Sequence, residues 1–94
     1  MIQGKKDCEE FLNQREAFYD YYDRKAFSYD SYSGTYGWNC KTRIIYNDGI
    51  WYVYSWGQGW SDIRSTMKTY PELLEIIWKD RKFINAELKR REEI

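Results

Sequence analysis

Histidine is absent from this 94-residue chain, and its absence excludes much of the chemistry that proteins perform. Histidine is the commonest general base, the commonest metal ligand and the usual partner of a serine or cysteine nucleophile. The two cysteines, Cys8 and Cys40, are too few for a zinc site, and their spacing fits no zinc-binding pattern. We therefore expect no metal, no cofactor and no enzymatic activity.

Long apolar runs are also missing. No segment approaches the roughly 18 apolar residues of a transmembrane helix. The N-terminus turns polar at Gln3 and lacks the apolar stretch of a signal peptide. We therefore expect a cytoplasmic protein without a membrane association. Cys8 and Cys40 would be free thiols in that compartment, and the alternative on their number alone is a disulfide between them.

Charge of either sign is not in excess, because the chain has 15 basic and 15 acidic residues. A protein that coats nucleic acid would carry a basic excess. A wholesale mimic of DNA would carry an acidic excess. The balance therefore argues against direct nucleic-acid binding.

Aromatic residues, in contrast, are abundant. The chain has 5 Trp, 10 Tyr and 4 Phe, most of them between Phe18 and Trp60. A domain of this size buries only roughly 60–65% of its unfolded surface, so we expect some of these rings to be exposed. Exposed rings are typical of recognition surfaces, which favours binding over chemistry.

The spacing of apolar residues divides the chain into helical and strand-like segments. Recurrence at intervals of three and four predicts a helix over residues 7–27. Residues 28–39 fit either a strand with a turn or an irregular aromatic loop. Residues 61–68 are expected to form a short helix. Thr69-Tyr70-Pro71-Glu72 matches a capping box, which predicts a longer helix running to the C-terminus.

The clearest predicted element is a β-hairpin with the turn Asn47-Asp48-Gly49. Asp and Gly tolerate the positive φ that tight hairpin turns need. Two registers are open. A two-residue turn at Asp48-Gly49 pairs Tyr46 with Trp51, whereas a three-residue turn with a glycine bulge pairs Tyr46 with Ile50.

These elements predict one α+β domain over residues 1–94. We expect an N-terminal helix and a two- or three-stranded antiparallel sheet that includes strands 40–46 and 50–56. The short helix and the long C-terminal helix would pack on one face of that sheet.

Large rings occupy both faces of the second hairpin strand. Tyr52, Tyr54 and Trp56 lie on one side, and together with Trp60 they are the residues that we expect to contact a partner. The alternative is that these rings fill the core, the role that we assign to four other residues: Ile44, Trp51, Val53 and Trp78.

Charged residues provide two further candidates. Asp20, Asp23 and Asp30 lie among tyrosines and would complement the basic surface of a partner that itself binds nucleic acid. The alternative is a solvated acidic face. Basic residues of the last helix could contact phosphates or, alternatively, form a solvated face laced with ion pairs: Lys79, Arg81, Lys82, Lys89, Arg90 and Arg91.

The hairpin from Ile44 to Ser55 resembles the central hairpin of phage anti-CRISPR proteins that inhibit Cas9. The shared features are two isoleucines, Asn-Asp-Gly, then Tyr-Val and Ser, within a similar order of helix, strands and helices. The resemblance covers a small part of the chain. It implies a phage-encoded, non-catalytic protein that binds and blocks a bacterial defence enzyme. Such a protein presents a strongly acidic surface, whereas this chain is neutral, so no functional residue is carried over.

The leading hypothesis is therefore a small cytoplasmic inhibitor or adaptor that binds a protein partner, and it is compatible with a homodimer. One alternative is a nucleotide-binding sponge, in which rings stack on a nucleobase and Arg43 or Arg64 contacts a phosphate. Another is a protein that binds single-stranded nucleic acid through its rings and cations.

Overall fold

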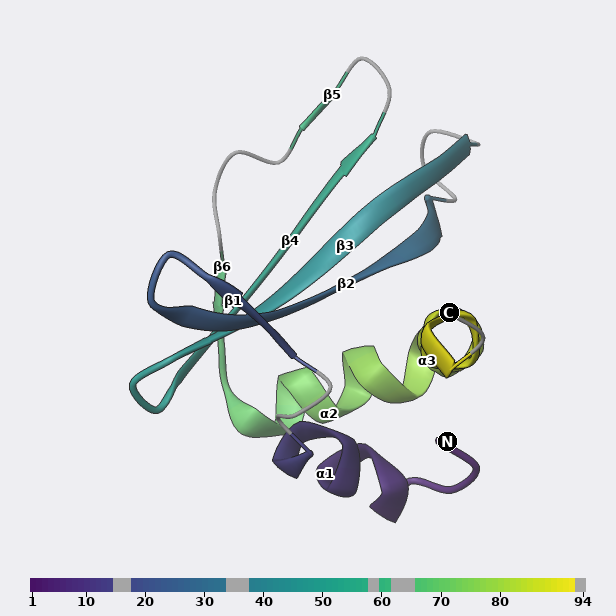
Figure 1. The fold of residues 1–94 in the computed structure, drawn as a ribbon, viewed down its shortest axis with the longest axis horizontal. Helices are drawn as coiled ribbons and strands as arrows, with labels where there is room; N and C mark the ends of the chain where they lie inside the picture. The colour runs from purple at the N-terminus through teal and green to yellow at the C-terminus, as the bar shows by residue number, and fades with distance from the viewer. Residues whose placement is uncertain (15–17, 34–37, 58–59, 62–65, 93–94) are drawn as a thin grey trace.

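Strands form the centre of the molecule, and the helices gather on one side of them (Figure 1). The computed structural model describes residues 1–14, 18–33, 38–57, 60–61 and 66–92, apart from the side chains of residues 32–33, 38–39, 60–61 and 66. In chain order, the elements are α1 (Lys6–Asn13), β1 (Tyr19–Tyr21), β2 (Arg24–Ser33), β3 (Trp38–Asn47), β4 (Ile50–Gly57), β5 (Trp60–Ser61), β6 (Thr66–Lys68), α2 (Tyr70–Lys79) and α3 (Arg81–Glu92).

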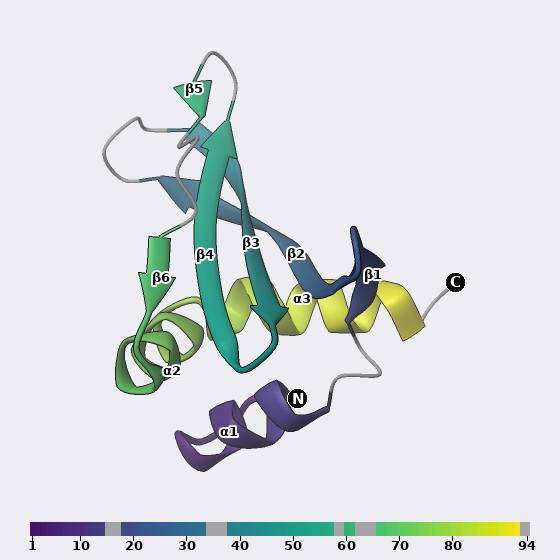
Figure 2. The same cartoon turned by 90° about the vertical axis from the view of Figure 1, so that its left-hand side faces the viewer.

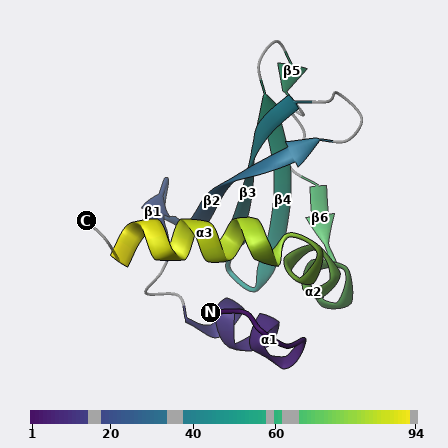
Figure 3. The same ribbon diagram turned by 90° about the vertical axis from the view of Figure 1, so that its right-hand side faces the viewer.

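The described strands form one antiparallel sheet in the order β1-β2-β3-β4-β5, and β6 also pairs with β4. Figures 2 and 3 show α1, α2 and α3 together at one end and one side of the sheet, with β5 at the opposite end. The predicted α+β class is thus confirmed, although the sheet has more strands than we expected. The strands that were not expected are β1, β5 and β6, because β3 and β4 form the predicted hairpin and β2 contains part of the segment that could be a third strand.

The central hairpin has the two-residue turn. Asp48 and Gly49 adopt φ values of 50° and 85°, and Tyr46 pairs with Trp51 while Asn47 pairs with Ile50. Positive φ at both turn residues is the geometry of a type I′ turn, which matches the twist of the flanking strands. This decides between the two registers that the sequence left open.

The predicted helix over residues 7–27 is wrong beyond its first third. The helix α1 ends at Asn13, and residues 19–21 and 24–33 are strands. Tyr22 and Asp23 adopt φ values of 47° and 64° in the turn between these strands, which no right-handed helix permits. From Phe27 onward, alternate side chains point into the core, so residues 28–33 belong to a strand rather than to an irregular loop.

The region between β4 and α2 also differs from expectation. Residues 66–68 form strand β6 and not the end of a short helix. This strand pairs with β4 from Trp51 to Val53, and the pairing provides hydrogen-bond partners for the backbone groups of β4. The C-terminal helix is interrupted at Asp80. The Asp80 N–H ends α2 by donating to the Ile76 carbonyl, and the Asp80 carbonyl begins α3 by accepting from Phe83 and Ile84.

A single core lies between the sheet and the helices. Four rings meet there: Phe11 of α1 stands edge-on to Phe27 of β2 at 5.0 Å, and Phe18 lies 6.2 Å from Trp51 of β4. Edge-to-face pairs of this kind contribute about 0.5–1.5 kcal/mol beyond the area they bury. Aliphatic side chains complete the core: Ile2, Leu12, Ile44, Val53, Leu73, Ile77 and Ile84.

The capping box at the start of α2 is present as predicted. The Thr69 hydroxyl accepts from the Glu72 N–H, and the Glu72 carboxylate accepts from the Thr69 N–H at 3.1 Å. Replacing Thr69 with Ala should lower the free energy of unfolding by about 1 kcal/mol, because the cap hydrogen bond is lost. Urea denaturation measures this, with Thr69→Ser as the control that keeps the hydroxyl. Equal loss in both variants would contradict the capping role.

Candidate binding face of the sheet

The register separates the side chains of the sheet into two sets. Phe27, Ile44, Trp51 and Val53 point toward the helices and are buried, in agreement with the core roles predicted for the last three. Trp78 of α2 is half-buried and packs against the core.

The opposite set lies on the side of the sheet where the figures show no helix (Figures 2 and 3). We call this surface the open face. Backbone pairing places these described side chains on it: Tyr19, Tyr21, Arg24, Ala26, Ser28, Asp30, Lys41, Arg43, Ile45, Tyr52, Tyr54, Trp56 and Met67.

The middle of the open face is itself packed. Ala26 and Ile45 point toward this side, yet they are 0% and 2% exposed. Tyr19 is the cross-strand partner of Ala26, and Tyr52 is that of Ile45, so large side chains of the same face flank both residues. Tyr21, Tyr52, Tyr54 and Trp56 are accordingly half-buried, while Met67 at the β6 edge is exposed.

Arg43 of β3 lies at the centre of the aromatic residues. Its guanidinium carbon is 4.5 Å from the ring centroid of Tyr21, 4.8 Å from that of Trp56 and 5.3 Å from that of Tyr54. A guanidinium at such distances is attracted by the negative faces of the rings. Three strands thus bring one cation and three rings together.

Hydrogen bonds hold this arrangement. Arg43 Nε donates to the Ser28 hydroxyl at 3.0 Å, and a terminal N–H of Arg43 donates to the Tyr54 hydroxyl. Ser28 also shares a hydrogen bond of 2.8 Å with the Tyr19 hydroxyl. Partial burial raises the pKa of Tyr54, so its hydroxyl stays protonated at neutral pH and can both accept and donate.

The predicted aromatic contact residues are largely brought together. Tyr54 and Trp56 lie on the open face with ring centroids 5.4 Å apart, and Tyr52 shares that face. Trp60 pairs with Gly57 through the backbone, but its side chain is outside the described part of the chain.

The predicted acidic residues do not converge on a single patch. Asp20 Oδ1 lies 2.5 Å from Lys25 Nζ, and Asp30 Oδ1 lies 3.3 Å from Lys41 Nζ. Lysines of the same sheet therefore neutralise both carboxylates. Asp23 is exposed in the turn between β1 and β2. The exposed ion pairs of Asp20 with Lys25 and of Asp30 with Lys41 contribute little to stability.

The basic residues of the last helix are partly engaged within the molecule. Glu87 pairs with Arg90 at 2.7 Å and with Arg91 at 3.1 Å, and the Arg90 hydrogen bond is the main reason that the pKa of Glu87 is lowered. Arg91 also stacks over Phe27, and Arg81 stacks over Trp78. This favours the interpretation of a salt-bridged helix face for Arg90 and Arg91, while Arg81 contacts the ring and the backbone carbonyl of Trp78.

The central position of Arg43 was only partly foreseen. Arg43 and Arg64 were equal candidates for a phosphate contact, and Arg64 lies outside the described residues. Tyr21 and Ser28 were missed as neighbours because Tyr21 was assigned to a helix. Arg43 and Ile45 are two residues apart, so their side chains point to the same face of β3. This spacing could have identified Ser28 as a neighbour of Arg43 only together with the register that pairs β2 with β3.

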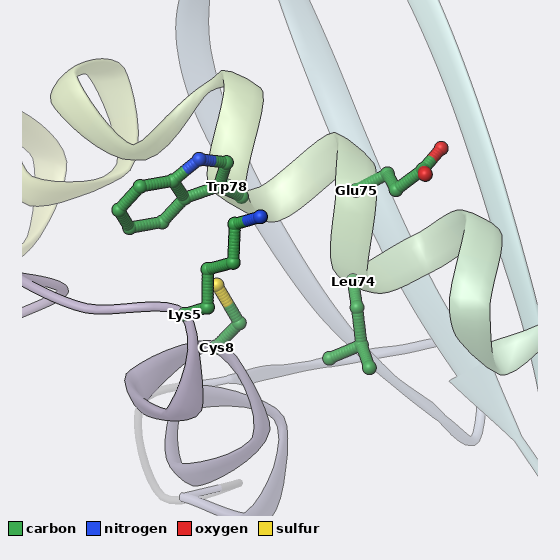
Figure 4. Close-up of a pocket in the computed structure, with 5 residues that line it drawn as sticks. All are labelled: Lys5, Cys8, Leu74, Glu75 and Trp78. Carbon is green, nitrogen blue, oxygen red and sulfur yellow. The ribbon is translucent and has the colours of Figure 1, made fainter.

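A cavity of about 410 Å³ lies between α1 and α2, away from the open face (Figure 4). Leu74 and Trp78 form its apolar wall, Cys8 lies on the α1 side, and Lys5 and Glu75 are its charged residues. Both charges are exposed, so the cavity lacks the buried polar groups that orient a specific ligand. The open face is therefore the stronger candidate site.

Two negative findings apply to the described part of the chain. It contains no group of three His, Cys, Asp or Glu side chains arranged to hold a metal ion. None of its helices has the length and apolar character needed to span a membrane.

Comparisons with protein-family models, curated proteins and solved structures found no match for the chain.

Cys8 and Cys40 are free thiols in the structure, not a disulfide. They are only 1% and 8% exposed, and burial raises the pKa of Cys8. Because the thiolate is the reactive form, a disulfide-exchange reagent at neutral pH should react with both thiols far faster in denaturant than in the native protein. Rapid reaction of either thiol in the native state would contradict the packing around it.

Tyr29 links the sheet to the break between α2 and α3. Its buried hydroxyl donates to the Asp80 carboxylate at 2.7 Å, and burial, with Asp80 as the second cause, raises the pKa of Tyr29. An unfolded tyrosine ionises near pH ~10. The contribution of Tyr29 to stability should therefore be complete below that pH and be lost as the pH rises above it.

Replacing Tyr29 with Phe should lower the free energy of unfolding by about 1–2 kcal/mol at neutral pH, because the hydrogen bond to a carboxylate is lost. It should also reduce the loss of stability above pH ~10. Urea denaturation over neutral to alkaline pH measures both effects. The exposed Tyr22 provides the control, Tyr22→Phe, for which neither effect is expected.

Proposed function

We propose that this protein is a non-catalytic binding protein that contacts a protein partner through the open face. The observation that carries the proposal is the placement of Tyr21, Tyr54 and Trp56 around Arg43 on the side of the sheet away from the helices. Trp, Tyr and Arg are the residues that dominate the binding energy of protein interfaces.

The partial exposure of these rings supports the same conclusion. Tyr52, Tyr54 and Trp56 are half-buried, so each is held in place by its neighbours and still presents apolar surface to solvent. Rigid aromatic side chains lose little entropy on binding, which makes such surfaces effective contacts. A homodimer through this face is a special case of the proposal.

The class of partner that we propose first is a bacterial defence nuclease, within a cytoplasmic setting. Its support is the resemblance of the β3–β4 hairpin to that of Cas9-inhibiting anti-CRISPR proteins. Among the described side chains of the open face, Asp30 is the one carboxylate and it is paired with Lys41, so that part of the face has no counterpart of the acidic surface used by such inhibitors. Inhibition by this chain would therefore depend on aromatic contacts and Arg43 instead.

The second candidate is binding of single-stranded nucleic acid, which the cation beside exposed ring faces favours. The zero net charge of the chain counts against it. Strong weakening of oligonucleotide binding with added salt would support this candidate, because phosphate contacts release counterions.

Replacing Trp56 with Ala should reduce capture of a partner from bacterial lysate by roughly 30-fold or more, the effect of losing a hot-spot residue of about 2 kcal/mol. The fold should persist, because Trp56 is not part of the buried core. The matched control is Phe83→Ala, which removes an exposed ring from α3. Equal capture by both variants would contradict the proposal.

A further inference from the structure

Arg43 differs from two lysines of the sheet in that they form ion pairs with carboxylates. Lys25 pairs with Asp20 and Lys41 with Asp30, and the two lysine side chains are 46% and 56% exposed to water. Arg43 is half-buried between rings, and none of the described carboxylates forms an ion pair with it. A partly desolvated cation without a counter-ion is an unfavourable arrangement that a bound anion would relieve.

The guanidinium also retains unused hydrogen-bonding capacity. Its Nε–H donates to Ser28, and one terminal N–H donates to Tyr54. An arginine has five N–H donors in a planar fork, so its other donors have no acceptor among the described side chains. The contacts with Ser28, Tyr54 and the rings hold the fork in one orientation, which reduces the entropy lost when an anion binds.

We infer that Arg43, held by Ser28, Tyr54 and the surrounding rings, binds one carboxylate of the partner protein, an aspartate or glutamate side chain. This inference rests on the proposed function of the open face. A planar fork matches a carboxylate with two parallel hydrogen bonds. Tyr21 and Trp56 would exclude water around that pair, as the rim of an interface hot spot does.

The distribution of charge favours a single carboxylate over a nucleic-acid strand. A strand needs a series of cations that follow its phosphates. On the open face, Lys41 is already neutralised by Asp30 at 3.3 Å. Arg24 is the backbone partner of Tyr21, but its side chain is exposed at the β1–β2 turn, and none of the cation–ring contacts among the described residues involves it. The aromatic centre of the face therefore offers one fixed positive charge.

The test is an NMR titration of the isotope-labelled full chain with a short peptide that contains glutamate, acetyl-Ser-Glu-Gly-Glu-Ser-amide. The same peptide with glutamine in place of glutamate is the neutral control. The Nε–H resonance of Arg43 and the indole N–H of Trp56 report binding at the site. We expect saturable shifts with the glutamate peptide at millimolar concentration and none with the glutamine peptide.

Three variants separate the role of Arg43 from general charge. Arg43→Lys keeps the charge but loses the fork, and should weaken the peptide at least about tenfold. Lys25→Gln removes a cation of β2 that points to the other face and is paired with Asp20, and should leave the affinity unchanged. Tyr54→Phe keeps the ring, removes the hydroxyl that orients Arg43, and should weaken the peptide a few-fold.

Four outcomes would overturn the inference. They are equal shifts with both peptides, no shift at Arg43, equal loss of affinity in the Lys25 and Arg43 variants, and tighter binding of a short oligothymidylate than of the glutamate peptide at the same resonances. The last outcome would favour a nucleic-acid partner instead. In the lysate capture, loss with Trp56→Ala but not with Arg43→Lys would retain the proposed function and remove this inference. Unchanged capture with both would remove both.

Discussion

The left-handed backbone of Asp48 and Gly49 sets the pairing of β3 with β4, and the rest of the structure depends on that pairing. With a two-residue turn, Trp51 and Val53 point into the core. A shift of one residue would move every side chain of the strand to the other face. It would place Tyr52 and Tyr54 under the helices and expose Trp51. The turn therefore decides both what stabilises the fold and which rings are available to a partner.

The two faces of the sheet are held by different interactions. On the helix side, Phe27 and Trp51 join rings from α1 and from the segment before β1 in an apolar core, and Tyr29 fixes the α2–α3 junction through Asp80. On the open face, where the figures show no helix, rings pack instead around Arg43. Cation–ring contacts at partly exposed sites are worth only about 0.5–2 kcal/mol each. The contacts with Arg43 thus hold the rings of the open face in a defined arrangement for a partner, while the rings remain partly exposed.

Short sequence motifs correctly predicted the elements whose geometry depends on residues close in the sequence. The capping box placed the start of α2, and Asn-Asp-Gly placed the central hairpin. The helix predicted through residue 27 failed because the aromatic residues of this segment fit a period of three to four as well as a period of two, and pairing with β3 selects the second. The Arg43 cluster could not be derived in the same way. It requires the registers of β1, β2, β3 and β4 together, and the β1–β2 turn has Tyr22 and Asp23 rather than glycine.

Paramagnetic relaxation by a soluble gadolinium chelate, measured on the tryptophan side chains by NMR, tests the central claim most directly. This claim is that the register presents Trp56 to solvent and encloses Trp51. The exposed fraction of Trp51 is 7%, whereas Trp56 is only half-buried. We expect strong relaxation of the Trp56 ring protons and weak relaxation of those of Trp51. The reverse order would mean that the other face of β4 is open, and the proposed binding face would then be wrong.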